Sequence, residues 1–242
     1  MRSPRRVWRA VIACGALAIA VMNVGCEKPR PGGKCEVGQA ICMDSSTVLA
    51  CEGAVFALAR CRGPAGCTKV GTRVSCDDGV AEVGDACLQT TTENRACSGD
   101  KKQSLLCDHG KFALVQLCRG PGGCQLKGDQ VSCDTKLAEK GDTCTTAGAF
   151  ACTTDLKSRI VCKDGKFGFD RNCRGATGCH PSDQACDETV SDIGDPCGTP
   201  GMAACNPDGS DLLSCQGGQF VKDHSCKKTG CHVRPEGKVE CL

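Results

Sequence analysis

Apolar residues alternate with polar ones on both sides of a short polar turn at four places along the chain, in residues 49–58, 105–114, 160–169 and 213–222. A period of two around two turn residues predicts a β-hairpin in each segment. A two-residue turn would pair a cysteine with a phenylalanine in every copy: Cys51 with Phe56, Cys107 with Phe112, Cys162 with Phe167 and Cys215 with Phe220. It would also place Leu49 with Leu58, Leu105 with Leu114 and Ile160 with Phe169 on the same face, whereas Lys222 replaces the last apolar residue in the fourth copy.

The turn residues indicate the turn type. His109-Gly110, Asp164-Gly165 and Gly217-Gly218 suit a type I′ turn, and Gly53-Ala54 suits a type II′ turn. Phenylalanine beside a cysteine on one hairpin face is typical of a small core, so we interpret these four of the six phenylalanines as structural.

The hairpins belong to a repeat with a period of 52 to 57 residues, and each repeat carries six cysteines. We call the segment from the first to the sixth cysteine of a set a module and number the modules 1 to 4. The cysteines of the four sets are Cys35, Cys42, Cys51, Cys61, Cys67, Cys76; Cys87, Cys97, Cys107, Cys118, Cys124, Cys133; Cys144, Cys152, Cys162, Cys173, Cys179, Cys186; and Cys197, Cys205, Cys215, Cys226, Cys231, Cys241. Asp44, Asp100, Asp155 and Asp208 follow the second cysteine and predict a turn there.

Each module has only 42 to 47 residues, too few to bury a core that is stable alone. Three disulfides per module, at about 2–4 kcal/mol each, would supply the missing stability. Six cysteines allow fifteen connectivities, and spacing does not choose among them. The sequence therefore predicts a small disulfide-rich fold of four tandem modules built on short β-hairpins, with little helix, in an elongated array. Zinc-type Cys and His spacings are absent, so we expect no metal site or cofactor of that kind.

The three junctions between modules all have ten residues: DDGVAEVGDA (77–86), DTKLAEKGDT (134–143) and DETVSDIGDP (187–196). Constant length and the apolar residues Val80, Leu137 and Val190 in phase indicate ordered junctions and a semi-rigid, rod-like array. Each junction also repeats three carboxylates: Asp77, Glu82, Asp85; Asp134, Glu139, Asp142; and Asp187, Asp192, Asp195. These could hold calcium, or they could make turns and face solvent; the spacing matches no known calcium loop.

The short loop between the fourth and fifth cysteines carries a basic residue directly after the fourth cysteine. These residues are Arg62, Arg119, Arg174 and Lys227. A constrained basic loop is the kind of element that serine-protease inhibitors present to their enzyme, because preorganisation tightens binding. The alternative is a Gly/Pro turn with a solvated cation. We keep these four residues as candidate interaction residues.

The N-terminus has the organisation of an export signal. Arg2, Arg5, Arg6 and Arg9 precede an apolar run over residues 11–24, which is shorter than the roughly 20 residues of a membrane-spanning helix. Val24-Gly25-Cys26 resembles the lipobox of bacterial lipoproteins, although Asn23 stands where such boxes carry an aliphatic residue. The resemblance implies acylation of Cys26, which would also account for the cysteine left over from the four sets of six. The alternative is a secreted protein with Cys26 free or in an intermolecular bridge.

The predicted organisation is a signal peptide over 1–25, an anchor cysteine and tether over 26–34, and modules over 35–76, 87–133, 144–186 and 197–241. Removing the signal peptide leaves 26 basic and 28 acidic side chains, a net charge of −2, because the chain has 30 basic residues and four lie in the signal. No basic run remains, which argues against nucleic acid as a partner. No Tyr remains and the only Trp, Trp8, lies in the signal, so we expect no aromatic platform for carbohydrate.

No catalytic motif is present, so we expect that the chain is not an enzyme. Its composition and export signal are similar to those of cysteine-rich lipoproteins of Gram-negative bacteria. The sequence favours a lipid-anchored protein of the cell envelope whose array has a structural or binding role, such as adhesion or capture of an extracellular protein ligand. A serine-protease inhibitor, secreted or at the surface, is the alternative. Glu27, which follows the anchor cysteine, is not the Asp linked to inner-membrane retention, so the outer membrane is weakly favoured.

Overall fold

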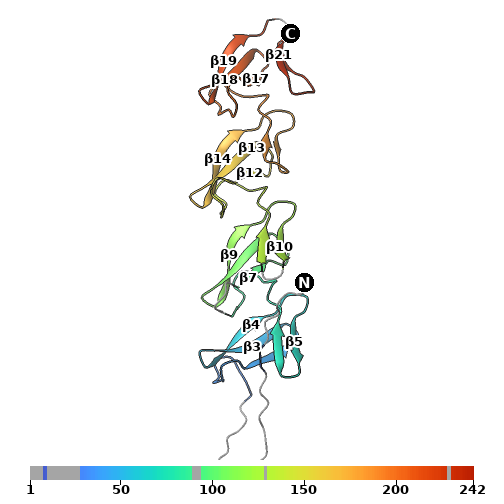
Figure 1. Ribbon diagram of the computed structural model, residues 1–242, viewed down its shortest axis with the longest axis vertical. Helices are drawn as coiled ribbons and strands as arrows, with labels where there is room; N and C mark the ends of the chain where they lie inside the picture. Colours follow the sequence, from blue (N-terminus) through green and yellow to red (C-terminus); the bar gives the residue numbers. More distant parts are fainter. Residues whose placement is uncertain (1–7, 10–27, 89–93, 128–129, 228–229) are drawn as a thin grey trace, which may run out of the picture. The chain divides into compact units, whose positions relative to one another are not determined.

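The computed structural model describes residues 8–9, 28–88, 94–127, 130–227 and 230–242, and these residues form strands and turns without a helix (Figure 1). Each module consists of a three-stranded antiparallel sheet followed by a two-stranded hairpin. The predicted class, a small disulfide-rich fold built on β-hairpins, is therefore confirmed. The export signal and the acylation of Cys26, predicted for residues within 1–7 and 10–27, lie outside the described residues.

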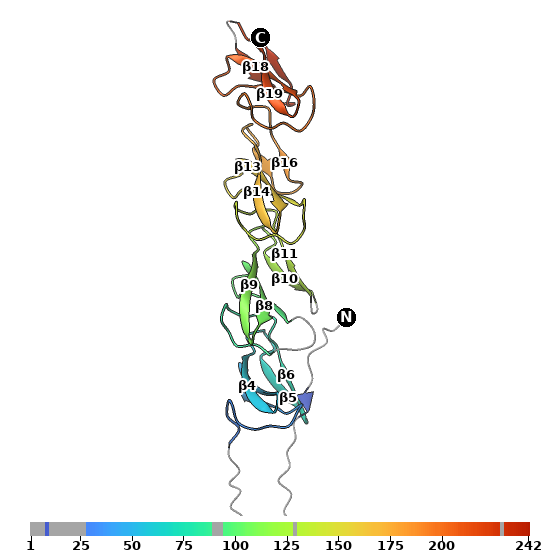
Figure 2. The same ribbon diagram turned by 90° about the vertical axis from the view of Figure 1, so that its left-hand side faces the viewer.

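The three-stranded sheets are meanders whose middle strand is the second in sequence. They are β2 (Ala40–Asp44), β3 (Thr47–Glu52) and β4 (Val55–Arg60); β7 (Arg95–Cys97), β8 (Gln103–Asp108) and β9 (Lys111–Leu117); β12 (Phe150–Cys152), β13 (Ser158–Lys163) and β14 (Lys166–Asn172); and β17 (Ala203–Cys205), β18 (Asp211–Gln216) and β19 (Gln219–Ser225). Figure 2 shows β8 and β9 of module 2, and β13 and β14 of module 3, side by side.

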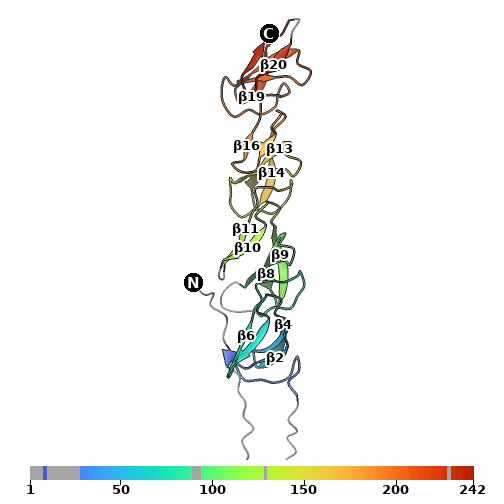
Figure 3. The ribbon, with the colours of Figure 1, turned by 90° about the vertical axis from the view of Figure 1, so that its right-hand side faces the viewer.

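The hairpin that ends each module joins the fifth cysteine to the sixth. The four hairpins are β5 (Cys67–Val70) with β6 (Arg73–Cys76), β10 (Cys124–Lys127) with β11 (Gln130–Cys133), β15 (Cys179–His180) with β16 (Ala185–Cys186), and β20 (Cys231–Val233) with β21 (Val239–Cys241). In module 1 a further strand, β1 (Trp8–Arg9), pairs with β6 (Figure 3).

The chain divides into two compact units. One comprises Met1–Gln116 with Cys124–Cys133, and the other comprises Leu117–Gly123 with Asp134–Leu242. Every contact described below lies within one of these units.

The predicted hairpin register is confirmed in the three modules whose pairing is described. Cys51 faces Phe56 and Leu49 faces Leu58 in module 1, Cys162 faces Phe167 and Ile160 faces Phe169 in module 3, and Cys215 faces Phe220 and Leu213 faces Lys222 in module 4. The turn at Gly53-Ala54 differs from the prediction. Both residues have positive φ, 56° and 69°, which is the type I′ pattern of the other three turns and not type II′. Ala54 therefore adopts a conformation that the other modules give to glycine.

The core of each module is centred on this hairpin. Its phenylalanine (Phe56, Phe112, Phe167 or Phe220) is 0–6% exposed, and the apolar residue at the middle of the sheet (Leu49, Leu105, Ile160 or Leu213) is at most 1% exposed. The last apolar residue of the predicted face contributes less than expected, since Leu114 is 47% exposed and Phe169 is 46% exposed. These residues lie on β9 and β14, two positions after the buried Phe112 and Phe167, so the buried part of each strand ends between them.

The disulfides of modules 1, 3 and 4 follow one pattern, first to third cysteine, second to fifth and fourth to sixth, and the first two of these bonds recur in module 2. The first-to-third bonds are Cys35–Cys51, Cys87–Cys107, Cys144–Cys162 and Cys197–Cys215. The second-to-fifth bonds are Cys42–Cys67, Cys97–Cys124, Cys152–Cys179 and Cys205–Cys231. The fourth-to-sixth bonds include Cys61–Cys76, Cys173–Cys186 and Cys226–Cys241, and Cys118 and Cys133 are disulfide-bonded as well.

The second-to-fifth bond ties the terminal hairpin to the first strand of the sheet, and the fourth-to-sixth bond ties it to the end of the last strand, whereas the first-to-third bond joins the entry of the module to the middle strand. Each bond closes a loop of 13 to 27 residues, which corresponds to about 3 kcal/mol in the chain-entropy account of disulfides. Disulfides therefore supply the stability that a module of this size cannot obtain from apolar burial.

Candidate functional site

The basic loop after the fourth cysteine is a closed turn. The amide of the glycine that precedes the fifth cysteine donates to a carbonyl three residues earlier, as in Gly66 to Gly63 at 2.9 Å, Gly123 to Gly120 at 2.9 Å and Gly178 to Gly175 at 3.0 Å. In module 4 Gly230 donates in the same way to Lys227. A turn closed by its own backbone presents its side chains differently from an extended inhibitor loop, which lies along an enzyme cleft.

The three arginines of these loops bind the last aspartate of the junction that follows. Arg62 Nε lies 2.5 Å from Asp85 Oδ2, with its Nη2 3.0 Å from Oδ1. Arg119 Nε lies 2.8 Å from Asp142 Oδ2. These bonds join the end of one module to the entry of the next.

Arg174 makes the same contact in the third junction and extends it. Its Nε lies 3.3 Å from Asp195 Oδ2, and its Nη1 lies 2.6 Å from Asp192 Oδ2. Asn172 adds a hydrogen bond of 3.0 Å to the other oxygen of Asp195.

The receiving aspartate also caps its own junction. Its carboxylate accepts the backbone amide of the residue three positions earlier, in the pairs Glu82 to Asp85 at 2.9 Å, Glu139 to Asp142 at 2.8 Å and Asp192 to Asp195 at 3.0 Å. Burial acts to raise the pKa of Asp85, but the hydrogen bonds from Arg62 and from the Glu82 amide outweigh it and hold that pKa below its usual range.

The first aspartate of each junction binds the backbone of the basic loop, whereas the last aspartate binds the arginine side chain. Asp77, Asp134 and Asp187 each accept a backbone amide of the loop with one oxygen, from Ala65 at 3.1 Å, Gly122 at 2.9 Å and Thr177 at 3.1 Å. The other oxygen accepts the amide two residues later, from Gly79, Lys136 and Thr189. For Asp187, burial opposes ionisation, but hydrogen bonds from Thr189 and Thr177 lower its pKa.

A glycine in the loop leaves room for this carboxylate. A Cβ at Gly63, Gly120 or Gly175 would overlap the carboxylate of Asp77, Asp134 or Asp187, respectively. None of the three glycines has a positive φ, so space rather than backbone conformation requires them. In module 4 the same sequence position is Lys228, and the residue after the sixth cysteine is Leu242 in place of an aspartate.

The middle acid of the junction reaches forward into the next module. Glu139 accepts hydrogen bonds from the amide and hydroxyl of Thr154, and Glu82 accepts the Gly99 amide at 3.4 Å. The corresponding residue of module 4 is Pro207, which has no N–H to donate, and the junction before it has the shorter Asp192, which binds Arg174 instead.

The junction backbone pairs with the next module as a parallel bridge. Val80 pairs with Cys97, Leu137 with Cys152 and Val190 with Cys205. The residue that follows (Ala81, Ala138 or Ser191) donates its amide to the cysteine carbonyl at 2.9–3.0 Å and is 1% exposed. These buried residues were not predicted from the sequence, where only their apolar neighbours Val80, Leu137 and Val190 were identified.

The third junction has an additional buried network. Arg171 Nη1 lies 2.6 Å from Glu188 Oε1, and the other oxygen of Glu188 accepts the Gly198 amide of module 4 at 3.2 Å. Arg171 and Arg159 both bind Asp170, and the side chains of all four charged residues are at most 19% exposed. Burial acts to raise the pKa of Asp170, and the two guanidinium groups outweigh that effect and lower it.

The junction carboxylates thus have protein partners of different kinds. No group of three Asp, Glu, His or Cys side chains in the described ranges is arranged to hold a metal ion. Within those ranges there is also no helix long and apolar enough to cross a membrane.

The four candidate interaction residues have different surroundings. Arg62, Arg119 and Arg174 are bound to junction carboxylates, although 37–44% of each side chain remains exposed. Lys227 is exposed, and no carboxylate in the described part of the chain pairs with it. An inhibitor would have to break the ion pair of each arginine before that side chain entered an enzyme pocket.

The fold and the junctions define a class: a tandem array of small disulfide-stapled hairpin modules with ordered, charge-bonded junctions. Such an array is consistent with a structural or binding role, and its many disulfides indicate an oxidising, extracellular environment. Comparison of the chain with models of protein families, with curated proteins and with solved structures gives no match.

Proposed function

We propose that the chain is a lipid-anchored protein of the cell envelope in which the module array has a structural role: it holds successive modules in a fixed relation next to the membrane. The lipobox-like sequence at Cys26 supports the anchor. The observation that carries the structural role is that the arginine of each of the first three basic loops binds an aspartate of the junction that follows.

The bonding at the junctions favours a fixed relation between neighbours over a flexible tether. Between modules 1 and 2, Asp77 holds the loop of module 1, Glu82 holds a turn of module 2, and Asp85 holds Arg62. Between modules 3 and 4, Asp187, Glu188 and Asp195 act in the same way. In a flexible linker these carboxylates would be hydrated and would not bind either module. An exposed ion pair contributes little to stability by itself, so the fixed relation depends on the carboxylates of one junction binding together.

The anchor is tested by the intact mass of the protein purified from membranes, measured before and after reduction. We expect a chain that begins at Cys26, carries added acyl mass and gains about 24 Da on reduction of twelve disulfides. An unacylated chain would contradict the anchor, and a smaller gain would reveal free thiols.

The structural role is tested by replacing the junction cations. Arg62→Gln, Arg119→Gln and Arg174→Gln together should broaden the distribution of particle dimensions in small-angle scattering, whereas Lys140→Gln, Lys163→Gln and Lys166→Gln together, with the same charge change, should not. Identical scattering from both variants would contradict the role of the arginines. Titration of the native protein into trypsin separates this function from the inhibitor alternative, which requires inhibition at micromolar concentrations.

A further inference from the structure

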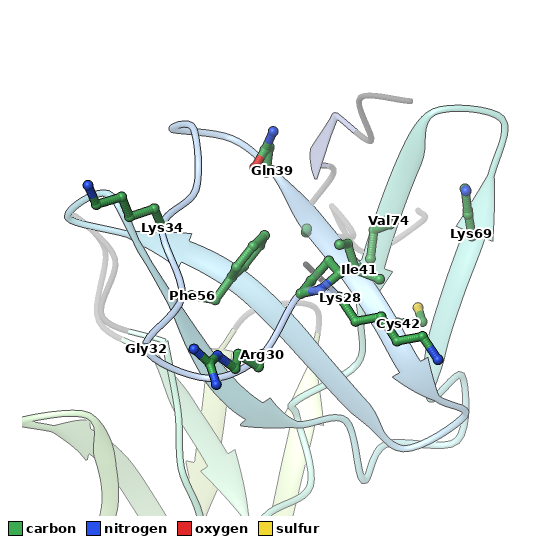
Figure 4. Close-up of a pocket in the computed structure, with 13 residues that line it drawn as sticks. Lys28, Arg30, Gly32, Lys34, Gln39, Ile41, Cys42, Phe56, Lys69 and Val74 are labelled. Carbon is green, nitrogen blue, oxygen red and sulfur yellow. The ribbon is translucent and has the colours of Figure 1, made fainter. Parts of the chain in front are cut away.

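Module 1 contains a cavity of about 890 Å³ on the side where modules 2 to 4 receive a junction (Figure 4). Its floor includes Ile41, Phe56 and Val74, so its interior is apolar. Ile41 takes the sheet position of Ala96, Ala151 and Ala204, which are fully buried, but it is only half-buried itself. Its larger side chain faces a space that a junction fills elsewhere.

The sequence before module 1 explains why this space stays open. Aligning Gly32 with Gly84 places Lys28 at the position of Val80 and Pro29 at the position of Ala81. Ala81 donates its amide to Cys97 at 3.0 Å, whereas proline has no N–H to donate to Cys42. The bond that seats the junction on modules 2, 3 and 4 therefore cannot form on module 1.

The rim of the cavity is cationic. Lys28, Arg30, Lys34 and Lys69 line it, and no acidic residue of the described chain does so. In Figure 4 Lys28 lies beside Ile41, Lys34 lies on one side of the cavity, and Lys69 of β5 lies on the opposite side. Cations around an apolar floor are complementary to an amphiphilic anion.

A second copy of the chain does not suit this cavity. At the first junction the residue that binds the arginine of the preceding module is Asp85, and module 1 has Gly33 in its place. If a second copy docked its module 4 on module 1, Lys227 would approach the cationic rim, and module 1 has no aspartate at the position that binds the basic residue in the other modules.

The membrane is the nearest source of an amphiphilic anion if Cys26 is acylated as we propose above. Lys28 follows Cys26 by two residues, which span at most about 7 Å. The cavity rim would then lie at the level of the lipid headgroups. Removal of residues 1–25 would also take β1 away from β6 and open the edge beside Val74.

We propose that this cavity binds the phosphate headgroup of an anionic phospholipid in the leaflet that holds the anchor. The lysines contact the phosphate, and the floor receives the glycerol and the first acyl carbons. The headgroup thus fixes module 1 against the bilayer in addition to the acyl anchor.

The test uses the mature chain with Cys26→Ser, produced behind a cleavable signal, so that no acyl group contributes. We expect it to sediment with vesicles of phosphatidylglycerol and phosphatidylcholine and not with phosphatidylcholine alone. Lys28→Gln, Lys34→Gln and Lys69→Gln together should weaken binding roughly 100-fold, since each interfacial lysine contributes about a factor of five. Lys140→Gln, Lys163→Gln and Lys166→Gln together are the control and should bind nearly as the parent does.

Equal losses in the two triple variants would overturn the proposal, because binding would then depend on net charge alone. Absence of binding to the mixed vesicles would overturn it as well. Saturable amide shifts at Ile41 and Phe56 with glycerol 3-phosphate, without vesicle binding, would assign the cavity to a soluble phosphate instead. Acylation itself is measured separately by intact mass, so failure of the anchor and failure of this site give different results.

Discussion

The pairing of Gly175 with Asp187 predicts a large effect from adding one methyl group. In Gly175→Ala the new Cβ would overlap the Asp187 carboxylate, which must then rotate away. That carboxylate accepts the Thr177 amide at 3.1 Å and hydroxyl at 2.7 Å, and the Thr189 amide at 3.1 Å and hydroxyl at 2.6 Å.

The loss of stability in Gly175→Ala follows from the hydrogen bonds that the Asp187 carboxylate gives up. A hydrogen bond to a charged group contributes about 1.5–3 kcal/mol, and loss of about two such bonds costs about 3 kcal/mol after water replaces part of them. Replacing glycine by alanine returns about 0.4–1 kcal/mol by restricting the unfolded chain. The net expectation is a loss of about 2–3 kcal/mol from the local free energy of opening.

Hydrogen exchange measured by mass spectrometry is the suitable assay, because modules of an array need not unfold together. The amides of Thr177 and Thr189 should exchange roughly 30- to 150-fold faster, at a factor of ten per 1.4 kcal/mol. Gly168→Ala is the matched control in the same module. Its Cβ would meet only the Val161 carbonyl at 3.9 Å, so exchange should change little.

A double-mutant cycle tests the cause. Asp187→Ala alone should lose the same hydrogen bonds, and Gly175→Ala should add no further loss in the Asp187→Ala background. Additive losses, or a Gly175→Ala variant as stable as Gly168→Ala, would refute the assignment of this glycine to space for the carboxylate.

Three further predictions concern other parts of the array. Ala54→Gly should stabilise module 1 by about 1 kcal/mol, because Ala54 has φ of 69°, whereas Ala57→Gly in β4 should destabilise it; thermal unfolding followed by circular dichroism checks both, and equal effects would contradict the strain at Ala54. The folded-state pKa of Asp85 and Asp187 is lowered, so their stabilisation is complete above the unfolded value of about 3.9 and is lost as the pH falls through the folded value. Hydrogen exchange of the amides at the first and third junctions should therefore accelerate below about pH 4. Asp187→Asn should remove that acceleration at the third junction only. Cys173→Ala with Cys186→Ala should destabilise module 3 by about 3 kcal/mol, measured as a lower midpoint in denaturant, and an unchanged midpoint would contradict a stapling role.

The hairpins could be predicted because their signals are local. Alternation with period two and a two-residue turn determine which residues face each other, as at Cys162 and Phe167. The turn type predicted for Gly53-Ala54 was wrong. Type I′ matches the twist of the flanking strands, and Ala54 adopts the positive φ that this turn type requires.

The disulfide pattern could not be predicted, because it depends on how the terminal hairpin packs on the sheet. The fifth and sixth cysteines face each other across that hairpin, as Cys67 and Cys76 do, yet each bonds elsewhere. Strand pairing alone would have suggested the wrong partner.

The role of the basic loops was missed because the partner of each arginine lies in the next junction. Arg62 and Asp85 are 23 residues apart, and so are Arg119 and Asp142. One sequence signal was available: the loop glycine occurs in the three modules that are followed by Asp77, Asp134 or Asp187, and module 4, with Lys228, has Leu242 instead.

Charged junctions suit modules that have little apolar surface to share. A module of this size needs its apolar side chains for its own core, where the hairpin phenylalanine is nearly fully buried. A junction made of carboxylates bound to amides and a guanidinium therefore adds connection between neighbours without taking apolar residues from either core. Such bonds are directional, so they specify the geometry of the junction as well as its stability, whereas an apolar contact of equal strength would permit sliding. This chemistry also makes the junctions, and not the disulfide-stapled cores, the first part of the array that acid should loosen.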